Sequence, residues 1–274
     1  MEPLVTRIDH VVIPDEDPDD LFTLFTEGLG LPGLWPVSDV GPFRSAGVAA
    51  GNCWIEIVAG AESLTPLYRP SLPAVVRGIA LDAGGTCSDA AESLHAAGVP
   101  VGPVTMFEGR RPDGVHGPLV TIAALPELVA DAGIAYLCEM AAPVSAGRVA
   151  DRTEAAAARS ETVGIRRIAE IGIGARDIGA VSRAWSRLAS PDGEGRWQLG
   201  GRPGERPGER LDGPAVHVTE SPIDGITGIT FAVVALDRAV ARLRARGLLG
   251  ALRSSGAGVN HAAAHGLDLW LVEA

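Results

Sequence analysis

Histidines and cysteines are the residues of this 274-residue chain whose side chains most readily bind metals or transfer protons. His261 and His265, in NHAAAHG, are four residues apart, a spacing that would pair two metal ligands on a helix. The neighbouring Asn, Ala and Gly instead favour a hairpin, so we do not expect a metal site there. His95 lies near the end of the predicted helix AAESLHAAG and His116 in the predicted loop DGVHGP, and we expect both to be exposed to solvent. The alternative for His116 is that its loop brings it over a pocket, where it would supply a metal ligand.

Several classes of catalytic site lack their sequence signature. The three cysteines, Cys53, Cys87 and Cys138, have no CxxC spacing, which suits a reducing cytoplasm and provides no disulfide framework. The chain contains no lysine, so Schiff-base chemistry is excluded. It also lacks a GxSxG elbow and a Gly-rich phosphate loop between a strand and a helix. We therefore expect neither a serine hydrolase nor a nucleotide-binding protein.

Charge and composition restrict the partners. The formal net charge is −11, which argues against nucleic acid because phosphate binding needs basic patches. The start MEPLVTRIDHVVIP does not resemble a signal peptide, and no run approaches 18 apolar residues, so we expect a cytoplasmic protein with no membrane partner. Arginine without lysine is typical of a high-GC bacterial genome, which suggests a bacterial origin and a place in specialised metabolism.

A fourfold internal repeat organises the chain. Each unit has a short apolar strand, a capped helix and about three further β-prone runs, near residues 5–60, 74–142, 165–221 and 225–274. Asp17 and Ser88 are the expected N-caps of the first two helices. The pattern predicts an α+β protein, with an N-terminal domain (1–142), a linker (143–164) and a C-terminal domain (165–274). A tandem RPGE within 192–214 predicts an exposed loop.

The repeat resembles the vicinal oxygen chelate superfamily, which includes glyoxalases, bleomycin-resistance proteins and extradiol dioxygenases. The resemblance covers almost the whole chain and is sharpest in the first unit, in IDHVVIP, GLGLP, AGN and WIEIV. It implies four βαβββ modules, paired into two curved mixed-sheet domains of half-barrel shape. In metal-using members, the first strand of a module offers a His and the last strand a Glu, and two modules converge on one metal.

The resemblance assigns candidate ligands in the N-terminal half. They are His10 in the first strand, Glu56 in WIEIV and Glu139 in YLCEM, although the register could slip by one onto Cys138. Gly78 stands where the second histidine would be. The set implies a divalent ion. One imidazole and two carboxylates suit Fe, Mn, Zn and Ni alike, so these ligands do not identify the metal. Glu56 and Glu139 are also the candidate catalytic bases.

The C-terminal half departs further from the implied ligand pattern. Glu170 and His217 stand at the His and Glu positions with their types exchanged, and Gly228 and Trp270 take the other two positions. We therefore expect no tightly bound metal in this half. Glu170 and His217 should instead form a buried hydrogen-bonded pair.

Two functions remain open for a chain of this pattern, which we expect to be a monomer or a homodimer. The first is a metal-dependent enzyme, of isomerase, lyase or oxygenase type, acting on a small oxygenated organic molecule. The second is a metal-free protein that binds or sequesters small molecules. Trp35, Phe43 and Trp54 are candidate pocket residues in either case, and core packing is the alternative role for each of them.

Overall fold

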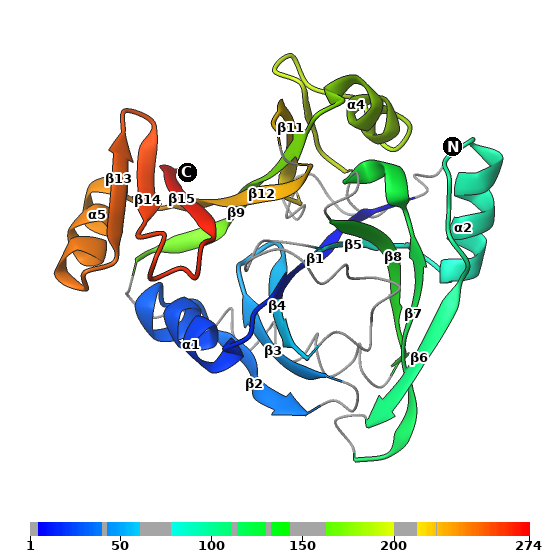
Figure 1. Ribbon diagram of the computed structural model, residues 1–274, viewed down its shortest axis with the longest axis horizontal. Coiled ribbons are helices and arrows are strands. Elements are labelled where there is room, and N and C mark those ends of the chain that lie inside the picture. The colour runs from blue at the N-terminus through cyan, green and yellow to red at the C-terminus, as the bar shows by residue number, and fades with distance from the viewer. Residues whose placement is uncertain are drawn as a thin grey trace.

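The computed structural model describes residues 5–39, 43–60, 78–110, 114–129, 133–142, 163–199, 213–222 and 224–274. Within these ranges the chain forms two mixed β-sheets, one of eight strands and one of seven. Figure 1 shows that the first sheet curls into a half-barrel and that the helices lie outside it. The predicted α+β architecture of two curved mixed sheets is confirmed.

The first sheet contains the strands of the first two units. Its elements are β1 (Arg7–Pro14), α1 (Pro18–Thr23), the π-helix η1 (Leu24–Gly28), β2 (Gly33–Asp39), β3 (Arg44–Ala49), β4 (Trp54–Ala59), β5 (Gly78–Asp82), α2 (Cys87–Ala96), β6 (Thr105–Arg110), β7 (His116–Ala124), the 3-10 helix η3 (Pro126–Leu128) and β8 (Ile134–Met140). The strand order is β2-β3-β4-β1-β5-β8-β7-β6.

The second sheet contains the strands of the last two units. Its elements are β9 (Ile165–Ala175), α4 (Ile178–Ser186), β10 (Arg196–Trp197), β11 (Ala215–Glu220), β12 (Gly225–Val233), α5 (Leu236–Ala245), β13 (Leu249–Arg253), β14 (Gly256–Val259) and β15 (Asp268–Glu273). The strand order is β10-β11-β9-β12-β15-β14-β13.

Each sheet is built from two similar halves around a central antiparallel pair. In the first sheet, β1 pairs antiparallel with β5, and each of them pairs in parallel with the last strand of its own unit, β4 or β8. The second sheet repeats this pattern with β9 and β12 at the centre and β11 and β15 beside them. The repeat therefore defines equivalent positions in the four units, through the register of their strands.

The helix starts follow local capping chemistry. Asp17 caps α1 by accepting a hydrogen bond from the Asp20 N–H, and Pro18 is the first helical residue, as predicted. The predicted cap Ser88 is wrong. Thr86 caps α2 instead, accepting from the Asp89 N–H at 3.1 Å, so that the helix begins two residues earlier than Ser88 would allow.

One hydrophobic core joins the two sheets and their helices. It includes Phe25 and Leu94 from the helices of the first half and Trp185 and Leu243 from those of the second. The Trp185 indole donates a hydrogen bond to the Leu128 carbonyl at 2.9 Å, so α4 is tied to the first half. Burial of these side chains is the main force that holds the two halves together.

Some expectations fall outside the part of the chain that can be described. These are the tandem RPGE and nearly all of the proposed linker, so the domain boundaries stay predictions. Among the helices of the described ranges, none is both long and apolar enough to cross a membrane.

Candidate functional site

A β-bulge places His10 on the concave face of the first sheet. Ile8 pairs with Leu81 and His10 pairs with Ala80, so Asp9 is an extra residue on β1. Such an extra residue changes the side to which the following side chain points. Ile8 accordingly lies in the main core beneath the helices, whereas Ala80, the partner of His10, belongs to a second apolar cluster on the other face.

The His10 imidazole is buried and makes polar contacts through both nitrogens. Only 1% of the residue is exposed. Its Nδ1 lies 2.9 Å from Asp9 Oδ2, and its Nε2 lies 2.9 Å from the Tyr136 hydroxyl and 3.5 Å from Glu56 Oε2. Because an ionised carboxylate can only accept, we assign the proton of the neutral ring to Nδ1. Nε2 then accepts from the Tyr136 hydroxyl.

Glu56 reaches the same face from the neighbouring parallel strand. β1 and β4 pair directly, with Glu56 opposite Val12. The Ser45 hydroxyl donates to Glu56 Oε1 at 2.7 Å, and the Trp35 indole donates to Ser45 Oγ at 3.2 Å. The structure thus brings His10 and Glu56 together, and the Ser45 contact leaves Oε2 as the carboxylate oxygen nearer to the imidazole. Their role as metal ligands stays a prediction.

Glu139 does not join this cluster. Its Oε2 accepts a hydrogen bond of 2.7 Å from the Cys87 backbone N–H, at the first residue of α2, on the helix side of the sheet. Successive side chains of a strand point to opposite faces, and the adjacent Cys138 lies in the apolar cluster of the concave face. The expectation that Glu139 meets His10 and Glu56 is therefore corrected, and so is its candidate role as a base there.

The strand registers identify the residue that takes its place. Glu56 pairs with the residue two positions beyond His10 on β1. In the second unit, Tyr136 pairs with the residue two positions beyond Gly78 on β5. Tyr136 is therefore the counterpart of Glu56, and Glu139 stands three residues too far along the strand. The sequence did not point to this tyrosine, because the resemblance implies a carboxylate at this position. Counting from Gly78 along the paired strands would have identified it.

Aromatic and aliphatic side chains surround the polar cluster. Trp54 stacks on His10 with ring centroids 3.9 Å apart, and Trp35 meets Trp54 edge-on at 5.2 Å. Phe43 packs against the second apolar cluster. The three aromatic residues predicted for a pocket therefore lie on or beside the concave face, although Trp54 is 1% exposed and also serves as a core residue. The cluster itself contains Tyr136 and Val12, Val58, Ala80, Ile122, Ile134 and Cys138.

Two separations within the polar cluster match those between neighbouring ligands of one ion. Two ligands bound at ~2.1 Å lie about 3.0 Å apart at right angles and about 3.4 Å apart at the tetrahedral angle. The separations from His10 Nε2 are 2.9 Å to the Tyr136 hydroxyl and 3.5 Å to Glu56 Oε2. A carboxylate on the other ring nitrogen, here Asp9, is the usual support of a metal-bound histidine. These residues therefore fit a divalent ion.

A second grouping on this face shares two of these residues. The ligand atoms of Asp9, His10 and Cys138 all lie within 4.8 Å of one another, so they too form a group that could hold a metal ion.

The Cys87 thiol, by contrast, lies on the helix side of the sheet. Burial and then the Glu139 charge raise the pKa of Cys87 to about 11, which keeps this thiol protonated near neutral pH.

The equivalent cluster of the second sheet contains an additional cation. Glu170 Oε1 lies 3.5 Å from His217 Nδ1, which confirms their predicted contact. Arg196 lies against the same carboxylate, with Nε 3.0 Å from Glu170 Oε2, and it also pairs with Glu194. The side chains of Glu170 and His217 are 25% and 33% exposed, so the expectation of a buried pair is wrong. His217 lies on β11, which only the two-residue edge strand β10 separates from the end of the sheet.

Loop groups beside this cluster add to its charge. Backbone N–H groups of Arg196 and then Glu194 hold the pKa of the Asp192 carboxyl below its usual value. Trp270, at the fourth ligand position, donates to Asp268, and the Arg253 guanidinium lies 4.0 Å from the centre of its ring. In the second sheet, therefore, one arginine, Arg196, lies against the Glu170 carboxylate, and a second, Arg253, lies over the Trp270 ring.

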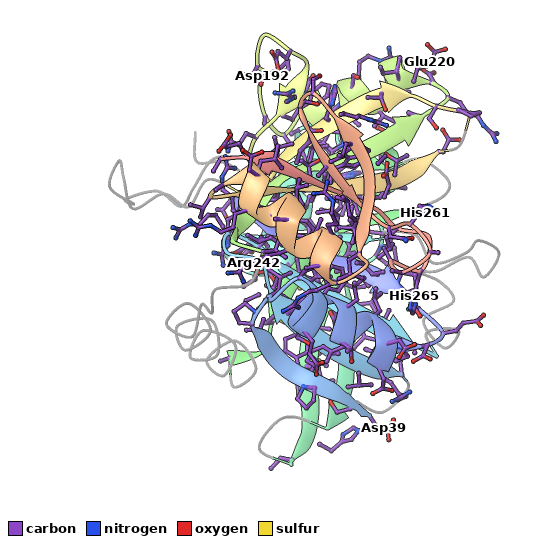
Figure 2. The ribbon with its side chains drawn as sticks, turned by 90° about the vertical axis from the view of Figure 1, so that its left-hand side faces the viewer. Asp39, Asp192, Glu220, Arg242, His261 and His265 are labelled. Carbon is purple, nitrogen blue, oxygen red and sulfur yellow. The ribbon has the colours of Figure 1, made fainter. Side chains whose placement is uncertain are left out.

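The remaining histidines lie away from both clusters. His261 and His265 belong to a run of turns (Figure 2). His265 Nδ1 lies 3.0 Å from Asp15 Oδ2. That contact ties the last unit to the first. His95 is exposed on α2, as expected, whereas His116 begins β7 and is exposed there, not in a loop.

Comparison with solved structures identifies the fold. No protein-family model and no curated protein sequence matches the chain. Among solved structures, homoprotocatechuate 2,3-dioxygenase from Arthrobacter globiformis superposes with a TM-score of 0.55 at 11% identity, over 98% of this chain and 80% of that one. The Mn(II)-bound glyoxalase from Novosphingobium aromaticivorans gives 0.55 at 11% identity, over 100% and 83%.

A third structure contains a small molecule. A single-residue variant of homoprotocatechuate 2,3-dioxygenase from B. fuscum, in complex with HPCA, gives a TM-score of 0.56 at 9% identity, over 100% of this chain and 72% of that one. These likenesses show that the chain has the vicinal oxygen chelate fold. At such low identity they carry no activity, which has to be argued from the residues.

Proposed function

We propose that the chain is a divalent-metal-dependent enzyme that acts on a small oxygenated organic molecule at the concave face of its first sheet. The observation that carries the proposal is the pair formed by His10 and Glu56, on adjacent strands with Nε2 and Oε2 3.5 Å apart. Asp9 supports the imidazole from behind. The fold neighbours include an Mn(II)-bound glyoxalase, which is in keeping with such a site.

Each residue of the site has a separate task in this proposal. His10 binds through Nε2, and its Nδ1–H, held by Asp9, fixes the tautomer that makes this possible. Glu56 is anchored through Oε1 by Ser45, so Oε2 is free either to bind the ion or to hold a proton taken from the substrate. A bound ion would chelate neighbouring substrate oxygens and stabilise the negative charge that develops on them.

A metal-free small-molecule-binding protein is the second candidate, and one observation favours it. Tyr136 donates to His10 Nε2 at 2.9 Å, so the nitrogen expected to bind an ion is satisfied by the protein itself. The same polar cluster, walled by Trp54 and aliphatic side chains, would then orient a ligand by hydrogen bonds alone. Sequestration of the ligand would be the function.

Metal analysis separates the two candidates. The protein is purified without chelator, its metal content is measured, and it is titrated with Mn(II), Fe(II), Zn(II) and Ni(II). We expect one ion per chain, with affinity reduced at least ~10-fold in Glu56→Gln. Glu139→Gln is the matched control and should bind as the wild type does, because Glu139 bonds to α2. If no ion binds while small molecules still quench tryptophan fluorescence, the binding protein is the correct function.

A further inference from the structure

We infer that Tyr136 is the third protein ligand of this site and that it binds the ion through its phenolate oxygen. This inference rests on the proposed function. Internal symmetry is its starting point. The register that places Glu56 opposite the second residue beyond His10 places Tyr136 opposite the second residue beyond Gly78.

The second sheet obeys the same register and supports the equivalence. His217 pairs with the residue two positions beyond Glu170, and Trp270 pairs with the residue two positions beyond Gly228. An aromatic side chain thus stands at the fourth position in both sheets. The indole of Trp270 offers no lone pair, since its nitrogen is only a donor, whereas the phenol of Tyr136 becomes an oxygen ligand once it loses its proton.

The position and orientation of the hydroxyl suit a ligand. It lies 2.9 Å from His10 Nε2, close to the ~3.0 Å between two ligands at right angles around one ion. Tyr136 is 8% exposed, and the aliphatic cluster of the concave face holds its ring. The ring also meets the imidazole edge-on, with centroids 5.9 Å apart, so both side chains already lie against each other on this face.

Charge balance is also preserved. The phenolate of Tyr136 replaces the carboxylate that was expected from Glu139, so the set still has one neutral nitrogen and two anionic oxygens. On binding, the ion forms a bond to the phenol oxygen and the hydroxyl proton is released to solvent, with no change of oxidation state. Among the described residues, His10 lies directly against this oxygen, and Asp9, Glu56 and Cys138 are ionisable groups near the His10 imidazole.

The chain contains two tyrosines, Tyr68 and Tyr136, so a spectroscopic test can be specific. Zn(II) is added to the full-length protein near neutral pH, and the tyrosinate difference spectrum is recorded in the ultraviolet. Fe(III) is the second probe, because its phenolate complexes absorb in the visible range. We expect both signals in the wild type and in Tyr68→Phe, and their loss in Tyr136→Phe together with an affinity at least ~10-fold lower.

The outcomes distinguish this inference from the function on which it rests. If Tyr136→Phe binds Zn(II) as tightly as the wild type, and neither protein shows a tyrosinate signal, the metal site stands and the tyrosine ligand is refuted. A signal that disappears in Tyr68→Phe refutes it as well. If the wild type binds no ion, both the ligand and the proposed function fall. Circular dichroism of Tyr136→Phe verifies that the variant is folded.

Discussion

Cys87 and Glu139 face each other where α2 begins, and this contact determines how one thiol responds to pH. Burial and the neighbouring carboxylate raise the pKa of Cys87 from 9.0 to about 11. Between these values the unfolded chain loses the thiol proton and the folded chain keeps it. The free energy of unfolding should therefore fall as the pH rises from 9.0 to about 11, whereas below 9.0 the contribution is fully present.

Replacement of this cysteine tests the effect directly. In Cys87→Ala, the loss of stability between pH 9.0 and about 11 should be smaller than in the wild type. Urea unfolding at both ends of this range gives, for each protein, the change in the free energy of unfolding with pH. The cost of the small cavity in the variant is the same at both pH values, so it does not affect this change. Equal changes in the two proteins would mean that the thiol ionises as readily in the folded protein as in the unfolded chain.

Single residues of the candidate site differ in how far the sequence could place them. The resemblance identified His10 and Glu56, because the motifs IDHVVIP and WIEIV that contain them are contiguous in the sequence. The prediction for Glu139 was wrong because successive side chains of a strand point to opposite faces. The register that decides which residues of β8 face His10 comes from its pairing with β5, which is distant in sequence. Arg196 could not have been found, since it reaches Glu170 only when β10 joins the edge of the second sheet.

At the scale of elements, β2 and β3 must approach closely to place Trp35 over the concave face. A Cβ at Gly47 would lie 2.3 Å from the Trp35 ring. Gly47→Ala should therefore displace the indole, break its hydrogen bond to Ser45 and destabilise the protein by ~1–3 kcal/mol. Urea unfolding measures the cost, and near-ultraviolet circular dichroism reports on the tryptophan environment.

Gly193→Ala provides the matched control for that substitution. A Cβ at Gly193 would meet no heavy atom within 4 Å, so its free energy of unfolding should stay close to that of the wild type. A Gly47→Ala protein as stable as this control, with an unchanged tryptophan spectrum, would show that the ring does not lie against the glycine.

Elements were more predictable than their irregularities. The strands and helices of each unit follow from apolar periodicity and caps, which are local signals. The bulge at Asp9 is different, because it exists only in the pairing of β1 with β5. It nevertheless determines the site, since without it His10 would lie on the same face as Ile8. The error in the α2 cap has a local cause. Thr86 and Ser88 both have a hydroxyl group that can cap a helix, and they are only two positions apart.

At the scale of the whole molecule, a buried asparagine joins the two sheets. Asn52 Nδ2 donates to the Ile168 carbonyl and its Oδ1 accepts from the Ile168 N–H, both at 3.0 Å. Asn52→Ala leaves these backbone groups without their partner, so we expect a loss of ~2–4 kcal/mol. Because one core spans both sheets, urea unfolding should remain a single transition.

Asn260→Ala is a control of the same type, and these are the two asparagines of the chain. Asn260 accepts from the Ala262 N–H within an exposed turn, so its loss should cost about 1 kcal/mol or less. Equal costs for the two variants would contradict the bridging role of Asn52. Two separate transitions in Asn52→Ala would show that the sheets unfold independently.

The polar clusters of the two halves differ in one charged side chain. The second cluster contains the Arg196 guanidinium, and the first has a tyrosine instead. The pair formed by Glu170 and His217 has the same 3.5 Å separation as the pair formed by His10 and Glu56. Arg196 lies 3.0 Å from Glu170, whereas His10 and Glu56 have a tyrosine beside them. A guanidinium so close repels a second cation and occupies the carboxylate that would bind it. We therefore expect Arg196, together with the residues at the other two ligand positions of the second half, to hinder metal binding there.

Removal of this arginine should open the second half. In a His10→Ala background, which disables the first site, we expect negligible Zn(II) binding. Adding Arg196→Ala should raise the affinity at least ~10-fold, because the repulsion between two charges ~4 Å apart amounts to roughly 1–4 kcal/mol from bulk water to a protein surface. Calorimetric titration measures the change, and Arg253→Ala, which removes a cation over Trp270, should cause none. If His10→Ala alone binds Zn(II) and loses it on Glu170→Gln, Arg196 does not close this half.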